Sequence, residues 1–242
     1  MFKRLFDIAV SAFGLLIASP ILLPVIALVW VQDRHSPFYI SYRVGKNEKL
    51  FKMIKLRSMV VNADKSGVDS TSSNDSRITP IGHFIRNYKL DELTQLWNVL
   101  LGDMSLVGPR PNVKSEVNIY TAEEKILLSA RPGITDFASI IFSDEGEILA
   151  DKEDPDLAYN QLIRPWKSRL GLIYIKNYSM LTDVQIIIFT VIAILSKEKA
   201  LQWVVSKLII LNADIELIEI SKRTSDLYPF PPPGSSEIVI NR

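Results

Sequence analysis

A long uncharged segment near the N-terminus constrains this chain more than any other feature. No charged residue occurs from Ile8 to Val31. As a helix this run would be roughly 36 Å long, enough to cross a hydrocarbon core of about 30 Å. Pro20 and Pro24 lie near its middle, and each proline removes a backbone donor and disfavours helix at the preceding residue. The sequence therefore predicts an apolar helix that breaks or kinks near Ser19 and Pro20.

Positive charge flanks both ends of this segment. Lys3 and Arg4 precede it, and the residues after it include Arg34, Arg43, Lys46 and Lys49. Because positive charge marks the cytoplasmic side of a membrane, both ends are expected there. A re-entrant helix-break-helix satisfies both patterns, with the Ser19 hydroxyl available to bond a carbonyl freed by Pro20. A proline-kinked single-pass anchor remains open, whereas a cleaved signal peptide is disfavoured because the run exceeds a usual signal-peptide core.

The composition narrows the classes of protein. The 242 residues suffice for one catalytic unit with appendages, and 48% of them are hydrophobic. Lys and Arg total 28 against 27 Asp and Glu, so no basic excess indicates a nucleic-acid partner. The absence of cysteine excludes disulfides and thiolate chemistry, and leaves any divalent ion to oxygen ligands or the two histidines. The mean hydropathy of +0.16 is concentrated in segments and indicates membrane contact.

The middle of the chain changes its pattern along its length. Residues 38–60 alternate apolar and polar around a turn at 45–48, which predicts a β-hairpin. Residues 62–77 are polar and predict a loop or lid. Apolar spacing then predicts a helix from about Ile78 and an amphipathic helix from about Asp91 to Leu101. Asp91 and Glu92 lie in its first turn, where the helix dipole alone favours acidic residues.

The loop after this helix contains Pro109-Arg110-Pro111. An arginine held between two prolines can offer its planar donor fork to a phosphate, although this tripeptide alone is a weak signal. A second turn of this type, Arg131-Pro132-Gly133, follows further along the chain.

Taken together, these residues resemble the bacterial sugar transferases, the monotopic polyprenyl-phosphate phosphoglycosyl transferases of the small single-domain type. The resemblance covers roughly residues 2–195, in order and with similar spacing. The segments that carry it are Lys3–Asp7, Ser19-Pro20, Arg43–Gly45, Lys55–Met59, Arg77–Gly82, Leu90–Leu93, Gln95–Val99, Gly102–Pro111, Arg131–Thr135 and Asp183.

The resemblance implies a reaction and a set of site residues. In such enzymes the aspartate of the Asp-Glu pair, here Asp91, attacks a nucleoside diphosphate sugar and forms an aspartyl-phosphosugar intermediate with release of the nucleoside monophosphate. The sugar phosphate then passes to polyprenyl (undecaprenyl) phosphate. The adjacent carboxylate, here Glu92, helps hold a magnesium ion. The implied substrate-binding residues are Arg110, Arg86, Lys55 and Arg57, and the implied membrane break is Ser19-Pro20.

The resemblance also implies an architecture and a location. We expect an α+β, mainly helical fold in which amphipathic interfacial helices surround an active site at the membrane surface. The expected divisions are a re-entrant segment at 1–35, a catalytic domain at 36–195 and an extension at 196–242. The expected location is the bacterial inner membrane with the site on its cytoplasmic face, in the first membrane step of glycan assembly. The expected donor is a UDP-sugar, and Asp136–Ile140 departs from the usual family sequence, so the sugar stays undefined.

The C-terminal third leaves several alternatives. The apolar run Val184–Leu195 is too short to span a bilayer, and it fits an interfacial helix or a buried core helix equally. Leu201–Ile220 can contact the membrane or a partner, including a second copy in a homodimer. The proline-rich residues 229–234 predict an extended tail. Two other functions are less favoured: a membrane-anchored scaffold of a glycan-assembly complex, and an anchored metal hydrolase using Asp91, Glu92 and His83.

Overall fold

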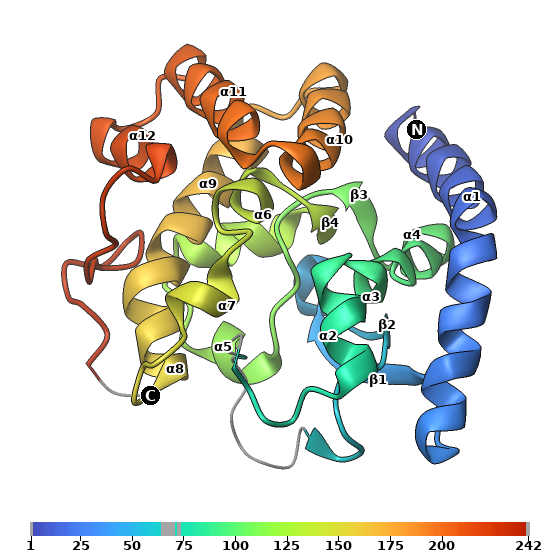
Figure 1. Cartoon of the computed structure of the whole chain (residues 1–242). Helices are drawn as coiled ribbons and strands as arrows, with labels where there is room; N and C mark the ends of the chain where they lie inside the picture. The colour runs from blue at the N-terminus through green and yellow to red at the C-terminus, as the bar shows by residue number, and fades with distance from the viewer. Residues whose placement is uncertain (1, 64–70, 72–73, 241–242) are drawn as a thin grey trace.

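The structure is a computed structural model that describes residues 2–63, 71 and 74–240. In this part the chain is mainly helical, with two two-stranded sheets, as Figure 1 shows. The expected α+β, mainly helical fold with a small β-hairpin is confirmed. Much of the predicted lid at 62–77 lies outside the described residues.

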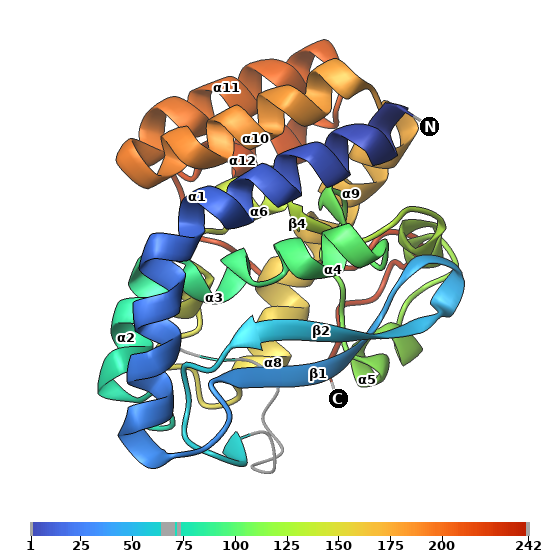
Figure 2. The same cartoon turned by 90° about the vertical axis from the view of Figure 1, so that its right-hand side faces the viewer.

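The N-terminal apolar segment forms one bent helix, α1 (Phe2–Asp33). Figure 2 shows the bend about halfway along α1, which contains Pro20 and Pro24. Ser19 Oγ donates to the carbonyl of Leu16 at 2.7 Å, and this carbonyl lies four residues before Pro20, which has no N–H to give it. The predicted discontinuity is therefore a bend rather than an interruption, because the hydroxyl replaces the missing backbone donor. The length and composition of α1 are sufficient to cross a membrane.

The two halves of α1 pack against the same globular body. Phe6 and Val10 lie against the main hydrophobic core, and Val25 and Val29 pack into a second cluster. That second cluster also contains Leu56, Ile85 and Leu90.

Polar contacts fix both ends of α1 to this body. Near its start, Lys3 Nζ lies 2.5 Å from Asp183 Oδ2, and Asp7 accepts hydrogen bonds from Ser105 Oγ at 2.9 Å. At its end, Asp33 pairs with Arg57. Both ends of the apolar helix are therefore held by one folded unit.

The predicted hairpin consists of β1 (Phe38–Val44) and β2 (Leu50–Leu56), joined through the short helix η1 (Lys46–Glu48). A side chain of α4 (Leu96–Leu101) covers the outer edge of β2. The Asn98 carboxamide accepts from Ile54 N at 2.9 Å and donates to the carbonyl of Lys52 at 2.7 Å. The buried amide thus bonds to the edge of β2 as a neighbouring strand would. It fixes α4, and with it the preceding residues that include Asp91, against β2.

The second sheet holds the Pro-Arg-Pro loop in place. It pairs β3 (Ser105–Val107) in parallel with β4 (Gly133–Thr135). A Cβ atom on Gly133 would lie 2.1 Å from the nitrogen of Gly108, so only glycine permits this approach. The loop that follows β3 is therefore pressed against the start of β4.

The C-terminal half surrounds this sheet with helices. The first half of α1 lies beside α10 (Met180–Leu195) and α11 (Lys197–Ile210) on one side of the molecule, as Figure 2 shows. The other helical elements are α2 (Pro80–Asn87), α3 (Leu90–Leu93), α5 (Lys114–Asn118), η3 (Glu124–Ser129), α6 (Phe137–Ile141), α7 (Glu145–Ile148), α8 (Pro155–Ala158), η4 (Tyr159–Ile163), α9 (Arg164–Lys176) and α12 (Ile215–Lys222).

Helix α10 has one buried and one exposed apolar face, so the buried-core alternative holds for its inner face and the interfacial role stays a prediction. Its inner face enters the core, where Ile186 is fully buried. Its outer face is apolar and exposed, and consists of Leu181, Ile188, Val191, Ile194 and Leu195. This outer face is typical of a helix that lies against a lipid surface.

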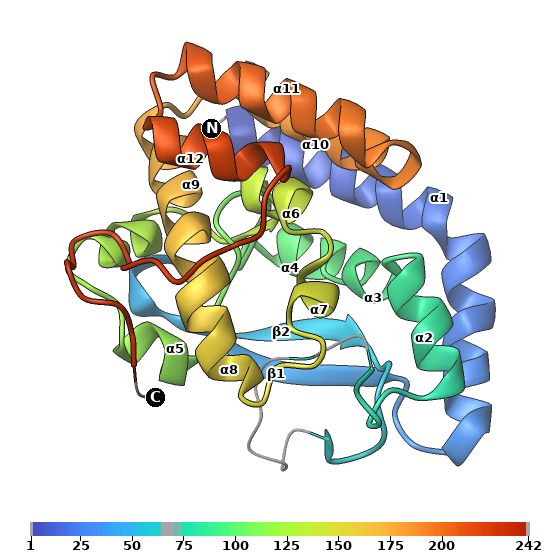
Figure 3. The ribbon, with the colours of Figure 1, turned by 60° about the vertical axis from the view of Figure 1, so that its left-hand side comes forward.

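The C-terminal extension packs onto the rest of the chain. Val204 and Leu208 of α11 are fully buried in the main core. The proline-rich tail is extended, as expected, and it is also bound: the Phe230 ring stacks on Trp166 at 4.3 Å between centroids, and Thr121 Oγ1 donates to the carbonyl of Pro233 at 2.5 Å. Figure 3 shows this tail running along the body below α12.

Candidate active site

Asp91 and Glu92 lie where the chain turns from α2 into α3. Lys89 adopts a left-handed conformation with φ of 55° and ends α2 sharply. Leu90 then enters the second hydrophobic cluster, which orients α3. The predicted helix from Asp91 to Leu101 is divided into α3 and α4 by Thr94 and Gln95, and Thr94 Oγ1 donates to the carbonyl of Ile54 at 3.2 Å. The acidic pair thus lies at a fixed position beside β2.

Lys55 of β2 faces Asp91. Its Nζ lies 3.8 Å from Asp91 Oδ2, and both side chains are mostly buried. Burial raises the pKa of Asp91, and the positive charge of Lys55 works against that rise. Burial likewise lowers the pKa of Lys55, opposed by the charges of Asp91 and Glu92. The lysine therefore favours the ionised carboxylate that a nucleophilic aspartate needs.

Glu92 forms an ion pair with Arg110 of the Pro-Arg-Pro loop. Arg110 Nη2 lies 2.5 Å from Glu92 Oε1, and Nη1 lies 3.3 Å from Oε2. Burial acts to raise the pKa of Glu92, but the charges of Arg110 and Lys55 outweigh it and lower that pKa to about 2. Glu92 in turn raises the pKa of Arg110. The structure thus brings Asp91, Glu92, Lys55 and Arg110 into one cluster.

Arg86 reaches the same cluster from α2. Its Nε donates to Ser58 Oγ at 2.9 Å. Burial lowers the pKa of Arg86, while the negative charge of Asp91 raises it. Helix α2 approaches Ser58 closely because residue 82 is glycine: a Cβ there would lie 1.8 Å from the Ser58 carbonyl oxygen. The glycine thus permits the contact that places Arg86 near Asp91.

Arg57 lies apart from this cluster. Its Nη2 donates to Asp33 Oδ1 at 2.7 Å and its Nε to the carbonyl of Ser36 at 2.8 Å. These contacts hold the end of α1, so we assign Arg57 to anchoring the apolar helix. The substrate-binding role of Arg57 stays a prediction.

The far side of Arg110 carries further charged groups. Its Nη1 donates to the carbonyl of Ile134 at 3.1 Å, and Asp136 begins α6 two residues later, accepting from Ser139 N at 2.7 Å. Burial raises the pKa of Asp136, against the charges of Arg110 and Lys167. The segment that departs from the usual family sequence therefore lies next to Arg110.

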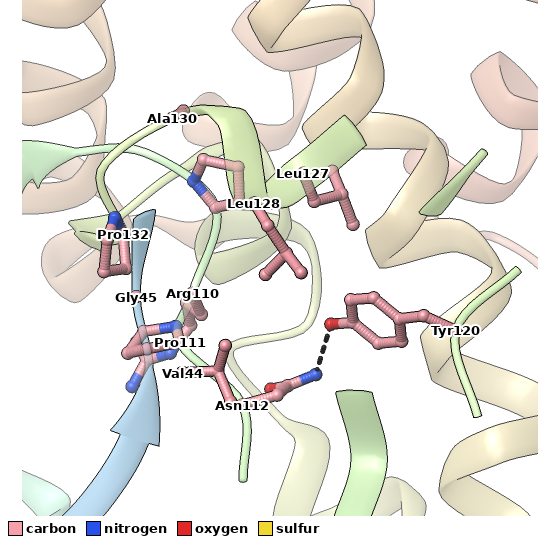
Figure 4. A pocket seen from close by; sticks show the side chains of 11 residues that line it. Val44, Gly45, Arg110, Pro111, Asn112, Tyr120, Leu127, Leu128, Ala130 and Pro132 are labelled. Atoms are coloured by element: carbon pink, nitrogen blue, oxygen red, sulfur yellow. Dashed lines mark hydrogen bonds between the residues drawn. The ribbon is translucent and has the colours of Figure 1, made fainter. Parts of the chain in front are cut away.

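A small pocket lies beside the Pro-Arg-Pro loop, as Figure 4 shows. It encloses about 20 Å³, and Asn112 Nδ2 donates to Tyr120 OH at 2.8 Å across its lining. This volume has room for about one water molecule. The pocket is therefore too small to hold a nucleotide in this conformation.

Asp91 and Glu92 are adjacent carboxylates and are the candidate metal ligands at this site. Among the described residues, no three His, Asp or Glu side chains gather to form a metal site. The hydrolase alternative with Asp91, Glu92 and His83 therefore finds no support in the side-chain positions. Mg²⁺, however, is usually held by one or two carboxylates together with substrate phosphates. Adjacent carboxylates beside a basic cluster fit that type of site.

Sequence patterns did not identify three positioning residues. Asn98 pairs with the edge of β2, and Lys3 and Asp183 join α1 to α10. Tyr174 OH also donates to Asp183 Oδ1 at 2.6 Å. All three lie in segments that carried the family resemblance, but their partners are distant in sequence, so their contacts could not be found without the fold.

Comparison with known proteins places the chain in a family. Residues 1–197 match the bacterial sugar transferase family, and the chain belongs to that family. The expected membership of the bacterial sugar transferase family is thereby confirmed.

Three relatives illustrate the similarity. The undecaprenyl-phosphate galactose phosphotransferase of Salmonella typhimurium is 35% identical over 82% of this chain and 41% of its own length. The UDP-N-acetylgalactosamine-undecaprenyl-phosphate N-acetylgalactosaminephosphotransferase of Aeromonas hydrophila is 32% identical over 80% of this chain and 44% of its own. The exopolysaccharide production protein ExoY of Sinorhizobium fredii is 32% identical over 79% of this chain and 84% of its own. The chain thus spans less than half of the first two proteins and most of the third.

Proposed function

We propose that this protein transfers a sugar 1-phosphate from a UDP-sugar to undecaprenyl phosphate and releases UMP. The observation that carries the proposal is the cluster in which Lys55 faces Asp91 and Arg110 binds Glu92. Two of the three relatives are named for transfer to undecaprenyl phosphate, with galactose in one name and N-acetylgalactosamine in the other. The sugar used by this chain is therefore left open.

In the first step, Asp91 acts as the nucleophile. One carboxylate oxygen attacks the phosphorus that bears the sugar, and the bond from that phosphorus to the bridging oxygen breaks, so UMP leaves with the bond's electron pair. An aspartyl-phosphosugar intermediate results. An oxygen of undecaprenyl phosphate then attacks the same phosphorus and displaces Asp91, which restores the enzyme and gives the undecaprenyl diphosphate sugar.

Phosphoryl transfer depends mainly on positioning and charge neutralisation, and the basic side chains of the cluster supply both. Lys55 and Arg86 approach Asp91 and are suited to the oxygens of the transferred phosphate. Arg110 is suited to bidentate phosphate binding. With the donor bound, we expect Arg110 to exchange part of its contact with Glu92 for a donor phosphate.

Mg²⁺ is proposed as the cofactor, with Glu92 as its protein ligand and the donor diphosphate as the remaining anionic ligand. A bound Mg²⁺ would neutralise charge on the diphosphate and on the leaving UMP. Release of Glu92 from Arg110 frees the carboxylate for this role.

The membrane supplies the acceptor. We propose that α1 enters and leaves one leaflet, because its two ends are fixed to the same body by the pairs Lys3–Asp183 and Asp33–Arg57. A straight helix of 32 residues would separate its ends by roughly 48 Å. Exposed apolar residues form the surface that we propose contacts the membrane. They are Phe13, Leu16 and Ile17 on α1, Trp97 and Leu101 on α4, and the outer face of α10. The positive-inside pattern supports a site on the cytoplasmic face of the inner membrane.

Release of UMP tests this function directly. The purified full chain in lipid nanodiscs is incubated with undecaprenyl phosphate, Mg²⁺ and each of a panel of UDP-sugars. We expect UMP and a lipid-linked sugar from at least one donor, and loss of both when EDTA is added. Absence of UMP with every donor, in nanodiscs shown to contain the carrier lipid, would refute the proposed activity.

A further inference from the structure

Asp144 joins the C-terminal extension to the segment beside Arg110. This residue lies directly before α7, and its Oδ2 is shared by two cations: Lys197 Nζ at 2.8 Å and Arg223 Nη2 at 3.0 Å. Lys197 is the first residue of α11, and Arg223 follows the last residue of α12. Burial acts to raise the pKa of Asp144, but these two cations outweigh it and lower that pKa. Two helices of the extension thus meet on one carboxylate.

The backbone conformation of Arg223 is unusual for a residue other than glycine. The residue has a φ of 55°, in the left-handed region where the C-terminal position of a helix usually holds glycine. This conformation is strained for a residue that has a Cβ atom. The Arg223 guanidinium also lies over the Phe142 ring, with 5.7 Å from Cζ to the ring centroid. The side chain therefore adds contacts on the 142–144 segment that a glycine would not make.

The segment held by Asp144 lies near Arg110. Glu145, the next residue, pairs with Lys167 of α9. The charge of Glu145, like that of Asp136, contributes to the raised pKa of Arg110. In Figure 1 the chain from β3 to α5, which carries Arg110, passes between α7 and α3. Arg110 Nη1 donates to the carbonyl of Ile134, ten residues before Asp144 in the same segment.

We propose that the C-terminal extension is a positioning element for donor binding: Lys197 and Arg223 hold Asp144 and α7, the continuation of the segment whose Ile134 carbonyl accepts from Arg110. The inference rests on the proposed function and deepens it. Arg223 lies beyond residue 197, where the family match ends, so this contact belongs to the part of the chain outside the shared region.

Arg223→Gly is the informative substitution. Glycine relieves the left-handed backbone at this position, so the melting temperature should stay the same or rise slightly. Loss of the guanidinium should nevertheless release α7. We expect the KM for the UDP-sugar to rise about 3- to 10-fold with kcat within about twofold of wild type. Arg223→Lys, which keeps a cation within reach of Asp144, should restore part of the difference.

Lys199→Ala provides the matched control. Lys199 is an exposed cation on α11 without a described carboxylate partner, so its removal changes the charge of the extension by the same amount. Its KM should equal that of wild type. An equal rise in KM in Lys199→Ala and Arg223→Gly would show a general charge effect and overturn the inference.

Amide hydrogen exchange tests the same contact without activity. In Arg223→Gly the amides of residues 142–149 should exchange faster than in wild type, whereas those of α4 should not change. Unchanged exchange at 142–149, or an unchanged donor KM in an active enzyme, would overturn the inference. If wild type released no UMP while exchange changed as expected, the proposed activity would fail and the contact between the extension and α7 would stand.

Discussion

Lys55 Nζ lies 3.8 Å from Asp91 Oδ2, and both groups are largely removed from solvent. Burial disfavours the ionised form of a carboxylate, and a nearby ammonium favours it. The pair therefore favours the ionised form of Asp91, the form that the proposed nucleophile needs. Lys55 lies on β2, and Asn98 joins β2 to α4. The fold itself therefore brings Lys55 and Asp91 together.

Lys55→Met should move the acid limb of activity. Asp91 must be ionised to attack, so the rate falls as the pH drops through its pKa. Removing Lys55 takes away a charge that lowers this pKa, so the acid limb should shift to higher pH. The measurement is the pH profile of kcat/KM, with Lys55→Arg as the charge-conserving control. An unshifted acid limb in Lys55→Met would show that Lys55 does not act on Asp91.

Glu92→Gln should reveal an acid-dependent contribution to stability. The pKa of Glu92 is lowered from 4.5 to about 2, chiefly by Arg110 acting against burial. A lowered pKa stabilises the folded state above the unfolded value, and this stabilisation is lost as the pH falls from about 4.5 towards 2. The expected difference between wild type and Glu92→Gln is about 1–3 kcal/mol at pH 6. It should shrink on acidification in unfolding followed by circular dichroism, and a difference independent of pH would contradict the assignment.

Asn98→Ala should destabilise the protein. The buried carboxamide satisfies a donor and an acceptor at the edge of β2, and removing it leaves both without partners. We expect a loss of about 2–4 kcal/mol in the free energy of unfolding. Asn87→Ala, at an exposed position of α2, should change it little. Similar unfolding midpoints for the two variants would mean that Asn98 does not join α4 to the hairpin.

Site-directed labelling tests the re-entrant arrangement. The chain contains no cysteine, so Phe2→Cys and Ser36→Cys each introduce a single thiol near one end of α1. Both thiols should react with an impermeant maleimide from the cytoplasmic side in inverted vesicles. Labelling of the two positions from opposite sides would establish a single-pass anchor and contradict the proposal.

The hairpin and the acidic helix could be predicted because their signals are local. Alternation within residues 38–60 gave β1 and β2, and apolar spacing placed Asp91 and Glu92 in the first turn of a helix. The bend of α1 followed from Pro20, but its continuity depends on the bond from Ser19 to Leu16. The sequence contains the Ser19 hydroxyl, but it does not show whether the helix would be interrupted or only bent.

Long-range contacts could not be read from the sequence. Arg57 resembled a phosphate ligand by its place in a family segment, yet its partner is Asp33, which the sequence did not single out. Arg110 was expected to meet phosphate, and in the structure its partner is Glu92. The packing of residues 224–240 depends on aromatic and carbonyl contacts with α9 and η4. None of these pairings has a signature in local spacing.

Trapping the covalent intermediate tests the central claim most directly. Wild-type protein is mixed with Mg²⁺ and an active UDP-sugar without undecaprenyl phosphate, quenched, and examined by intact-protein and peptide mass spectrometry. We predict a mass increase of one sugar phosphate on the peptide containing Asp91, its loss when undecaprenyl phosphate is added, and no increase in Asp91→Asn. An adduct on another residue, or turnover at the wild-type rate by Asp91→Asn, would contradict the account.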